Sequence, residues 1–262
     1  MDGYEKAARV VNVLDLFSGI GGFSLGLERA GFKTVAFCEI DPYARAVLRK
    51  HWPDVPCYDD VRTITAERLA ADGIEVQAIV GGFPCQDISS AGLGAGLAGE
   101  RSGLWREFAR LIGELRPRYV IVENVAALLD RGHGEVLGDL ARIGYDAEWD
   151  CLPASAVGAP HERRRVWIVA YPAGVGRPEV VSRQAVIRHA TGNEWQAGNA
   201  NPRGGAAERL SELERVHREP AILGSDDGFP HRAHRLRCLG NAVVPQIPEI
   251  IGRAIMATEH DR

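Results

Sequence analysis

The chain has 262 residues, of which 45% are hydrophobic and 25% charged, as is typical of a globular protein with a sizeable core. The net charge of −4 does not point to a nucleic-acid partner, although a local basic surface would be enough to bind one. The five cysteines are scattered and form no Cys-x-x-Cys pair, which argues against a disulfide framework and a structural zinc site. The first ten residues are polar, and no apolar run approaches the ~20 residues that span a membrane, so we expect a soluble intracellular protein.

The first strand-like segment leads into a glycine-rich turn. Residues 10–17 form a β-rich run, Ser18-Gly19-Ile20-Gly21-Gly22 follows at once, and residues 23–30 have the pattern of a helix. Strand, glycine turn and helix form the first unit of a nucleotide-binding α/β sheet, in which glycines let a ligand approach the backbone. Phe17 would add a flat apolar wall. A dinucleotide-dependent oxidoreductase would share this turn, which is a weak signal on its own.

Acidic residues follow the next two predicted strands. Glu39 ends the strand over 34–38, about 20 residues after the turn, where it is placed to bind the hydroxyl pair of a ribose. Asp41 precedes a proline and is the expected N-cap of a helix over 42–51. Asp60 follows a third short strand and either accepts a hydrogen bond from an adenine amine or lies in a solvated turn.

A cysteine follows a short apolar run that has the pattern of a buried strand. The strand over 76–80 ends in two glycines and a proline, which turn the chain. Cys85 comes just past this strand end, where open parallel sheets place their ligands. The next loop carries five glycines up to Gly103, which suits a mobile lid. The thiol is therefore a candidate nucleophile, and the alternative is a small buried cysteine before a surface loop.

Further helices and strands complete the predicted sheet. We expect helices over 104–115 and 136–143 and strands over 119–122 and 146–152. Glu123 directly follows one of these strands, so its carboxylate should lie at the same edge of the sheet as Cys85.

Three consecutive arginines lead into a last strand that ends near Ala170. The period of two along a strand puts Arg163 and Arg165 on one face and Arg164 on the other. Two neighbouring guanidinium groups can hold a carboxylate and bind a phosphate. Taken in isolation, a solvated charge run at a strand start would be the simpler explanation.

The last third of the chain has a different character. Residues 172–235 are rich in Gly, Pro, Asn, Arg and Glu and contain few strand-like runs. The chain closes with Gly240-Asn241-Ala242 and a predicted helix over 247–256. The Gly-Asn pair could cap this helix and present polar groups to a ligand.

Five motifs stand in a fixed order along the chain. They are Asp15–Gly22, Pro84-Cys85-Gln86, Glu123-Asn124-Val125, Arg163-Arg164-Arg165 and Gly240–Pro245. Together they resemble the motifs of the bacterial and phage DNA (cytosine-5-)-methyltransferases, with His161 where that family usually has glutamine. Each motif is modest alone, whereas five in the right order and spacing are highly specific.

The resemblance implies a fold and a reaction. The fold would be the Rossmann-like one of S-adenosylmethionine-dependent methyltransferases, a mostly parallel sheet with helices on both faces plus a small, irregular target-recognition region. The substrate would be a cytosine flipped out of duplex DNA, because its ring atoms are inaccessible in the stack. Cys85 would attack ring carbon 6, and Glu123 would donate a hydrogen bond or proton to ring nitrogen 3. Arg165 would orient Glu123 or the base carbonyl, with Arg163 nearby.

The resemblance also assigns binding residues. Contacts to S-adenosylmethionine would come from Phe17, Ser18, Gly19, Gly21, Glu39, Ile40, Asp60, Pro84, Leu104, Asn241 and Ala242. The lid would close on the flipped base and its phosphates through Gln86, Ser89, Ser90 and Arg101. No metal is expected.

The same resemblance suggests a division of the chain and its partners. Residues 1–171 would form the catalytic and cofactor-binding domain, 172–235 a short target-recognition region, and 236–262 a segment returning to the catalytic domain. The middle region is short for the family, so we expect a short or loosely read DNA site. We expect a monomer in the cytoplasm, associated with the nucleoid, and a cognate restriction endonuclease as the further partner in a restriction–modification system.

Three alternatives stay open. RNA cytosine methylation is one, although the RNA-acting relatives carry a Cys-Phe-Thr tripeptide that this sequence lacks. A catalytically impaired or relaxed-specificity relative that binds DNA or cofactor is another, and the intact Cys85, Glu123, Arg163 and Arg165 argue against it. An oxidoreductase, the third, would not need Pro-Cys-Gln followed by Glu-Asn-Val.

Overall fold

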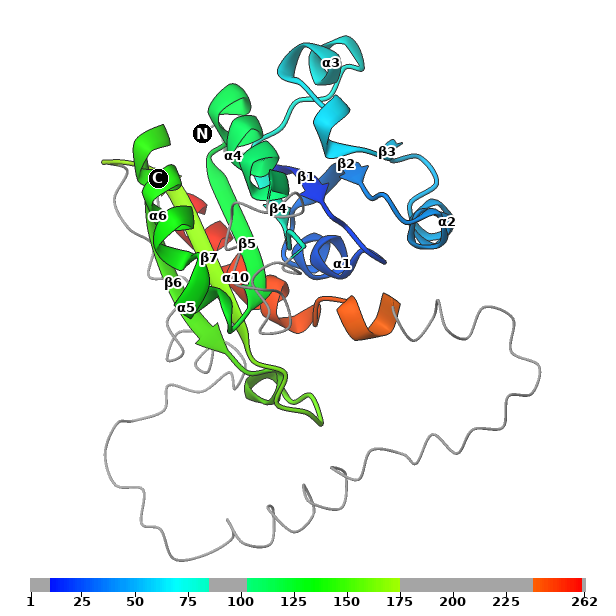
Figure 1. Cartoon of the computed structure of the whole chain (residues 1–262). Coiled ribbons are helices and arrows are strands. Elements are labelled where there is room, and N and C mark those ends of the chain that lie inside the picture. Colours follow the sequence, from blue (N-terminus) through cyan, green and yellow to red (C-terminus); the bar gives the residue numbers. More distant parts are fainter. Residues whose placement is uncertain (1–9, 85–102, 175–237, 261–262) are drawn as a thin grey trace, which may run out of the picture.

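A computed structural model of the chain describes residues 10–84, 103–174 and 238–260. Their strands form one seven-stranded sheet in the order β3-β2-β1-β4-β5-β7-β6 (Figure 1). Five strands are parallel: β1 (Asn12–Leu16), β2 (Lys33–Cys38), β3 (Cys57–Tyr58), β4 (Ala78–Gly81) and β5 (Tyr119–Val125). The other two form a hairpin in which β7 (Arg165–Pro172) lies antiparallel to both β5 and β6 (Tyr145–Leu152). The predicted, mostly parallel sheet is confirmed.

Helices cover both faces of the sheet. On one face lie α1 (Gly22–Arg29) and α10 (Gln246–His260), and on the other α3 (Ala66–Ala71), α4 (Gly103–Leu115) and α6 (His133–Ile143) (Figure 1). The remaining helical segments are α2 (Pro42–His51), α5 (Leu128–Arg131) and the 3-10 turns η1 (Val61–Thr63) and η3 (Ala154–Val157). Because both faces are covered, β5 is apolar on both: Ile121 packs with α1 and α10, whereas Val120 and Val122 pack with α4 and α6.

Helix α2 shows how local sequence sets an element's ends. Asp41 accepts hydrogen bonds from the backbone N–H groups of Tyr43 (2.8 Å) and Ala44 (3.4 Å), which confirms the predicted N-cap. Pro42 occupies the first helical position, where its missing N–H is not needed. The basic side chains in the last turn complement the negative end of the helix dipole.

The C-terminal segment returns to the start of the sheet by close backbone contact. A Cβ atom on Gly22 would lie 2.5 Å from the carbonyl oxygen of Val243, and one on Gly26 would lie 2.2 Å from that of Pro245. Only glycine permits this approach, so α1 and the segment before α10 pack with their backbones in contact. This packing places the Gly240–Pro245 motif beside α1, near the end of β1.

Four sequence-based expectations need correction. The strand predicted over 119–122 continues to Val125, so Glu123 lies within β5 and not after it. The strand predicted over 76–80 begins at Ala78, and the strand predicted over 10–17 spans Asn12–Leu16, because Phe17 has a left-handed backbone with φ 54°. Arg163 precedes β7 and has φ 25°, so strand alternation is not what places it beside Arg165. The short segments η1, α3, α5 and η3 were not predicted, since elements of six residues or fewer show no clear periodicity.

None of the helices in the described ranges combines the length and apolar character needed to cross a membrane.

Candidate active site

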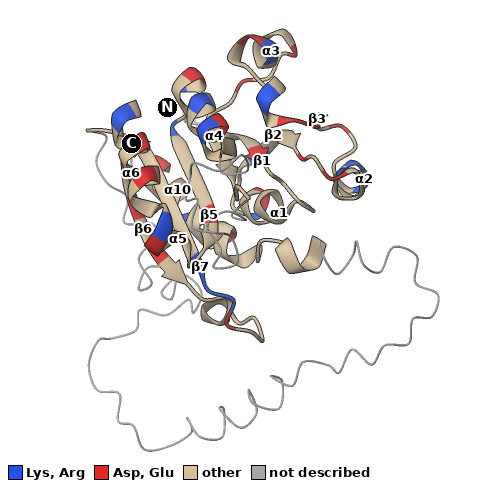
Figure 2. Ribbon diagram, in the orientation of Figure 1, with Lys and Arg blue, Asp and Glu red and all other residues tan. Residues whose placement is uncertain are grey.

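The carboxyl ends of β1, β2, β4 and β5 meet the start of β7 around a pocket of about 460 Å³. Neighbouring parallel strands end at the same edge of a sheet, which brings together side chains far apart in the sequence. The pocket is lined, among others, by Phe17, Glu39, Pro84, Glu123, Arg163, Arg165 and Asn241. Figure 2 shows basic residues where the chain enters β7, close to the end of β5.

Glu123 and Arg165 form an ion pair in this pocket. The distance from Arg165 Nε to Glu123 Oε1 is 3.0 Å, and the side chains are only 23% and 13% exposed, respectively. Burial raises the pKa of the Glu123 carboxyl, while the charges of Arg165 and Arg163 lower it again. A carboxyl group held in this balance can carry a proton into the pocket and still be oriented by a guanidinium.

Arg163 lines the same pocket as this pair. Its burial and the nearby charge of Arg165 lower the pKa of its guanidinium. An arginine stays charged even so, and two converging guanidinium groups make this wall of the pocket positive. Arg164, by contrast, pairs with Glu162 at 3.5 Å on the exposed side of the chain.

Asn124 links the end of β5 to the segment that precedes Cys85. Its side-chain amide donates a hydrogen bond to the carbonyl oxygen of Phe83 at 3.2 Å and is buried. Its Oδ1 accepts from the backbone N–H of Val125 at 2.8 Å. The sequence pattern did not assign Asn124 to the site, although it stands in the Glu-Asn-Val motif. It fixes the Phe83–Pro84 segment relative to Glu123.

Glu39 holds the glycine turn in place. Its Oε2 accepts from the backbone N–H of Gly19 at 2.7 Å and its Oε1 from that of Asp41 at 2.8 Å. One guanidinium nitrogen of Arg45 donates to the carbonyl oxygens of Glu39 (3.0 Å) and Ile40 (2.9 Å). The carboxylate lines the pocket and is oriented by its backbone partners.

A second pocket of about 340 Å³ adjoins the first, and Phe17, Ile40 and Pro84 line both. Leu104 and Asp60 line only the second, which extends between η1 and the start of α4. Phe17 stacks on Phe108 with ring centroids 6.4 Å apart, so its ring presents a fixed apolar surface.

Three of the expected cofactor residues line neither of these pockets. The Ser18 hydroxyl donates to the carbonyl oxygen of Asp15 at 2.6 Å and ties the end of β1 to β2. Gly21 is the N-cap of α1, and a Cβ atom there would lie 2.6 Å from the ring of Trp52, so its small size makes room for that indole. Ala242 is the third expected cofactor residue that lines neither pocket. The expected residues Cys85, Gln86, Ser89, Ser90 and Arg101 lie outside the described residues, as does 175–235 of the predicted recognition region.

Asp15 is a buried ionisable group that the sequence pattern did not single out. It lies in β1 below the glycine turn, is 0% exposed, and accepts a hydrogen bond from the Ser24 hydroxyl at 2.7 Å. Burial raises the pKa of its carboxyl to about 7. Within an apolar strand an aspartate gives no sequence signal of such burial. The described residues contain no cluster of three or more His, Cys, Asp or Glu suited to a metal ion.

Comparison with known proteins places this chain in a family. Residues 11–197 match the family model of the C-5 cytosine-specific DNA methylases. The type II methyltransferase M2.BsuMI of Bacillus subtilis is 38% identical over 168 residues, which are 61% of this chain and 42% of that protein. M.NgoMIV of Neisseria gonorrhoeae is 36% identical over 230 residues, which are 81% of this chain and 71% of that protein. The chain thus spans less than half the length of several curated relatives, M2.BsuMI among them.

Solved structures show the same fold. A candidate DNA modification methyltransferase encoded within an Escherichia coli prophage superposes with a TM-score of 0.66 at 21% identity, covering 95% of this chain and 99% of that one. The Dnmt2 methyltransferase of S. pombe gives a TM-score of 0.58 at 15% identity, covering 95% and 97%. The predicted Rossmann-like methyltransferase fold is therefore confirmed. With a matching family model over residues 11–197, this chain belongs to the C-5 cytosine-specific DNA methylase family.

Proposed function

We propose that this protein transfers a methyl group from S-adenosylmethionine to carbon 5 of a flipped-out cytosine in duplex DNA, through a covalent adduct with Cys85. The observation that carries the proposal is the largely buried Glu123 carboxyl, 13% exposed, with a raised pKa and an ion pair to Arg165, in a pocket that Pro84 also lines. The proposal assigns Cys85 to this pocket because Pro84, the residue directly before it in the sequence, lines the pocket. Family membership supports the same reaction.

The chain's own residues would activate the base. The Cys85 thiolate adds to ring carbon 6 while Glu123 donates a proton or hydrogen bond at ring nitrogen 3, so negative charge does not accumulate on the ring. Carbon 5 becomes nucleophilic and takes the methyl group, and loss of its proton then restores the double bond and expels the thiolate. Arg165 holds the Glu123 carboxyl toward the base, and Arg163 adds positive charge beside it. The thiol must be deprotonated to attack, so the site should lower its pKa.

The pockets suit the cofactor that this reaction requires. The two pockets adjoin through Phe17 and Ile40, which line both. The Glu39 carboxylate lines the first pocket, and the Asp60 carboxylate lines the second. The combined space fits a molecule with a charged amino-acid end, a diol and a flat base. S-adenosylmethionine, when bound, would supply an electrophilic methyl group on its sulfonium. Glu39 would bind the ribose hydroxyls, Ile40 and Phe17 would pack on the adenine, and Asp60 would face its amine.

The same resemblance supports the proposed partners. The relatives are named type II methyltransferases, which supports duplex DNA as substrate and a cognate restriction endonuclease as partner. Gln86, Ser89, Ser90 and Arg101 would contact the DNA, and the short region over 172–235 would read it with low stringency. We infer a monomer that works with the nucleoid in the cytoplasm.

The decisive experiment is transfer of a labelled methyl group from S-adenosylmethionine to unmethylated duplex DNA. We expect label at cytosine carbon 5 with the wild-type protein and none with Cys85→Ser. Cys151→Ser is the matched control, because this half-buried cysteine on β6 lines neither pocket, and it should retain activity. Sequencing of the product would give the recognition site.

Two results would contradict the proposal. Full activity of Cys85→Ser would exclude the covalent route. Absence of label from DNA with the wild-type protein, despite measurable cofactor binding, would exclude the DNA reaction. A parallel incubation with transfer RNA would then separate an RNA methyltransferase from an inactive relative.

A further inference from the structure

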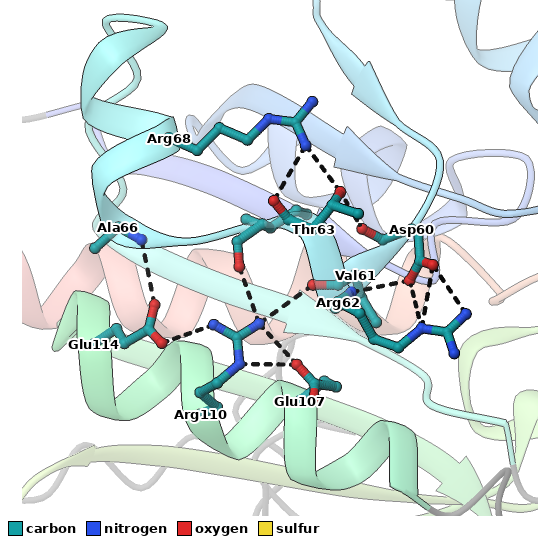
Figure 3. Close-up of polar contacts among 10 residues, drawn as sticks. Asp60, Val61, Arg62, Thr63, Ala66, Arg68, Glu107, Arg110 and Glu114 are labelled. Atoms are coloured by element: carbon teal, nitrogen blue, oxygen red, sulfur yellow. Dashed lines mark hydrogen bonds and ion pairs between the residues drawn. The ribbon is translucent and has the colours of Figure 1, made fainter.

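Asp60 is already engaged by a neighbouring side chain in the second pocket. Oδ1 of Asp60 accepts from Arg62 Nε at 2.9 Å, and Oδ2 accepts from Arg62 Nη2 at 2.9 Å (Figure 3). The backbone N–H of Arg62 also donates to Oδ1 at 3.0 Å, which makes Asp60 the N-cap of η1. These hydrogen bonds lower the pKa of the Asp60 carboxyl, so it stays ionised at neutral pH.

The acceptor capacity of Asp60 is therefore nearly used up. A carboxylate offers about four lone-pair directions on its two oxygens. Three N–H groups of Arg62 occupy them, with Nε shared between both oxygens at 2.9 and 3.1 Å. An amine that enters the pocket must share an oxygen with the guanidinium or displace it.

We infer that the Arg62 side chain competes with the cofactor's adenine amine for Asp60 and thereby weakens cofactor binding. This inference rests on the proposed function, because it takes the second pocket as the adenine site. Arg62 can be displaced at small free-energy cost, since its side chain is 63% exposed and an exposed ion pair contributes little net stability. Because two guanidinium nitrogens contact the carboxylate, we expect this pair to contribute more free energy than most exposed ion pairs do.

Asp60 would keep its orientation without the Arg62 side chain, because the backbone around η1 is fixed from elsewhere. Arg110 on α4 donates to the carbonyl oxygen of Ile64 at 2.9 Å, just after η1 (Figure 3). Glu107 and Glu114 hold Arg110 in place through ion pairs of 2.8 and 2.7 Å. The backbone N–H of residue 62 thus remains available to Asp60 after truncation of the side chain, while the remaining lone pairs become free for the amine.

The test is calorimetric titration of the protein with S-adenosylhomocysteine, which carries the amine, and with its analogue in which purine replaces adenine. Truncation in Arg62→Ala should tighten binding of S-adenosylhomocysteine by about threefold to fivefold. This change in affinity corresponds to the free energy that a well-formed exposed ion pair contributes. The purine analogue should bind the variant and the wild type equally, because it has no amine to place. In an Asp60→Ala background, Arg62→Ala should no longer change the affinity for S-adenosylhomocysteine.

Arg68→Ala is the matched control. It removes the same charge nearby, but Arg68 donates to Thr63 and lies over the Tyr58 ring rather than contacting Asp60. Unchanged or weaker binding of S-adenosylhomocysteine by Arg62→Ala, or an equal change for both ligands, would overturn the inference. Failure of the wild-type protein to bind S-adenosylhomocysteine would instead contradict the proposed function.

Discussion

Gly82, just after β4, leaves the space that the Glu123 carboxylate of β5 occupies: a Cβ atom on Gly82 would lie 2.8 Å from Oε2 of Glu123. The carboxylate that pairs with Arg165 can therefore occupy its position only because the residue after the neighbouring strand has no side chain. The glycine before Phe83 thus serves the geometry of the acid as well as the turn of the chain.

This close fit predicts that Gly82→Ala lowers kcat by about tenfold to a hundredfold, because an added methyl group displaces Glu123, the proposed proton donor, from its position. Binding of S-adenosylhomocysteine should change less than kcat, since most of its proposed contacts, such as Phe17, Glu39 and Asp60, lie away from the segment that follows β4. Methyl transfer and calorimetry on the same preparations measure both quantities. Gly138→Ala on α6, where a Cβ atom meets nothing within 4 Å, should keep full activity. Wild-type kcat in Gly82→Ala would show that the Glu123 position is not critical.

Asp15 predicts a pH dependence of stability. Its carboxyl has a pKa of about 7 in the folded protein, against 3.8 for the unperturbed group. Between these values the unfolded chain releases the proton and the folded chain keeps it, so the folded state binds more protons and its stability falls as pH rises. The Asp15 contribution has a limiting slope of about 1.4 kcal/mol per pH unit and levels off above the folded pKa.

The variant Asp15→Asn should abolish this contribution, because an amide of similar shape does not ionise. Urea unfolding at pH 5, 6, 7 and 8 should show a shallower loss of stability with rising pH than in the wild type. The exposed Asp54→Asn provides the control and should follow the wild-type curve. Parallel curves for wild type and Asp15→Asn would mean that Asp15 ionises normally in the folded protein.

The backbone contact between α1 and the C-terminal segment predicts a large effect of a small change. In Gly26→Ala the new methyl group would meet the Pro245 carbonyl, where a Cβ atom would lie only 2.2 Å away, and should force the two segments apart. We expect a loss of about 1–3 kcal/mol in the free energy of unfolding, typical of overpacking. Binding of S-adenosylhomocysteine should weaken as well, because Asn241 in the first pocket belongs to the displaced segment.

Equilibrium unfolding in urea measures this change. Gly113→Ala is the control, since this exposed glycine of α4 has nothing within 4 Å of an added Cβ atom, and it should be neutral or stabilising. Equal stability of Gly26→Ala and Gly113→Ala would show that the contact between α1 and the segment before α10 can relax without loss.

Local signals in the sequence specify the order of strands and helices and the strand ends that carry the site. Apolar runs, glycine turns and the Asp41 cap are such signals, and they locate β1, β2, β4 and β5 together with Glu39 and Glu123. Because parallel strands end at one edge, the neighbourhood of these residues also follows from the pattern. The order and spacing of the five motifs point to the family without any knowledge of side-chain contacts.

Contacts between side chains, in contrast, depend on the tertiary structure. The burial of Asp15, the space that Gly21 leaves for Trp52 and the tie from Asn124 to Phe83 require packing between distant segments. Arg163 approaches Arg165 through an irregular backbone that no period in the sequence describes. The engagement of Asp60 by Arg62 depends on the η1 turn, which is too short to leave a periodic signal. Neighbouring residues in the sequence determine the local conformation. Contacts between distant residues, burial and shifted pKa values arise only when the helices pack on both faces of the sheet.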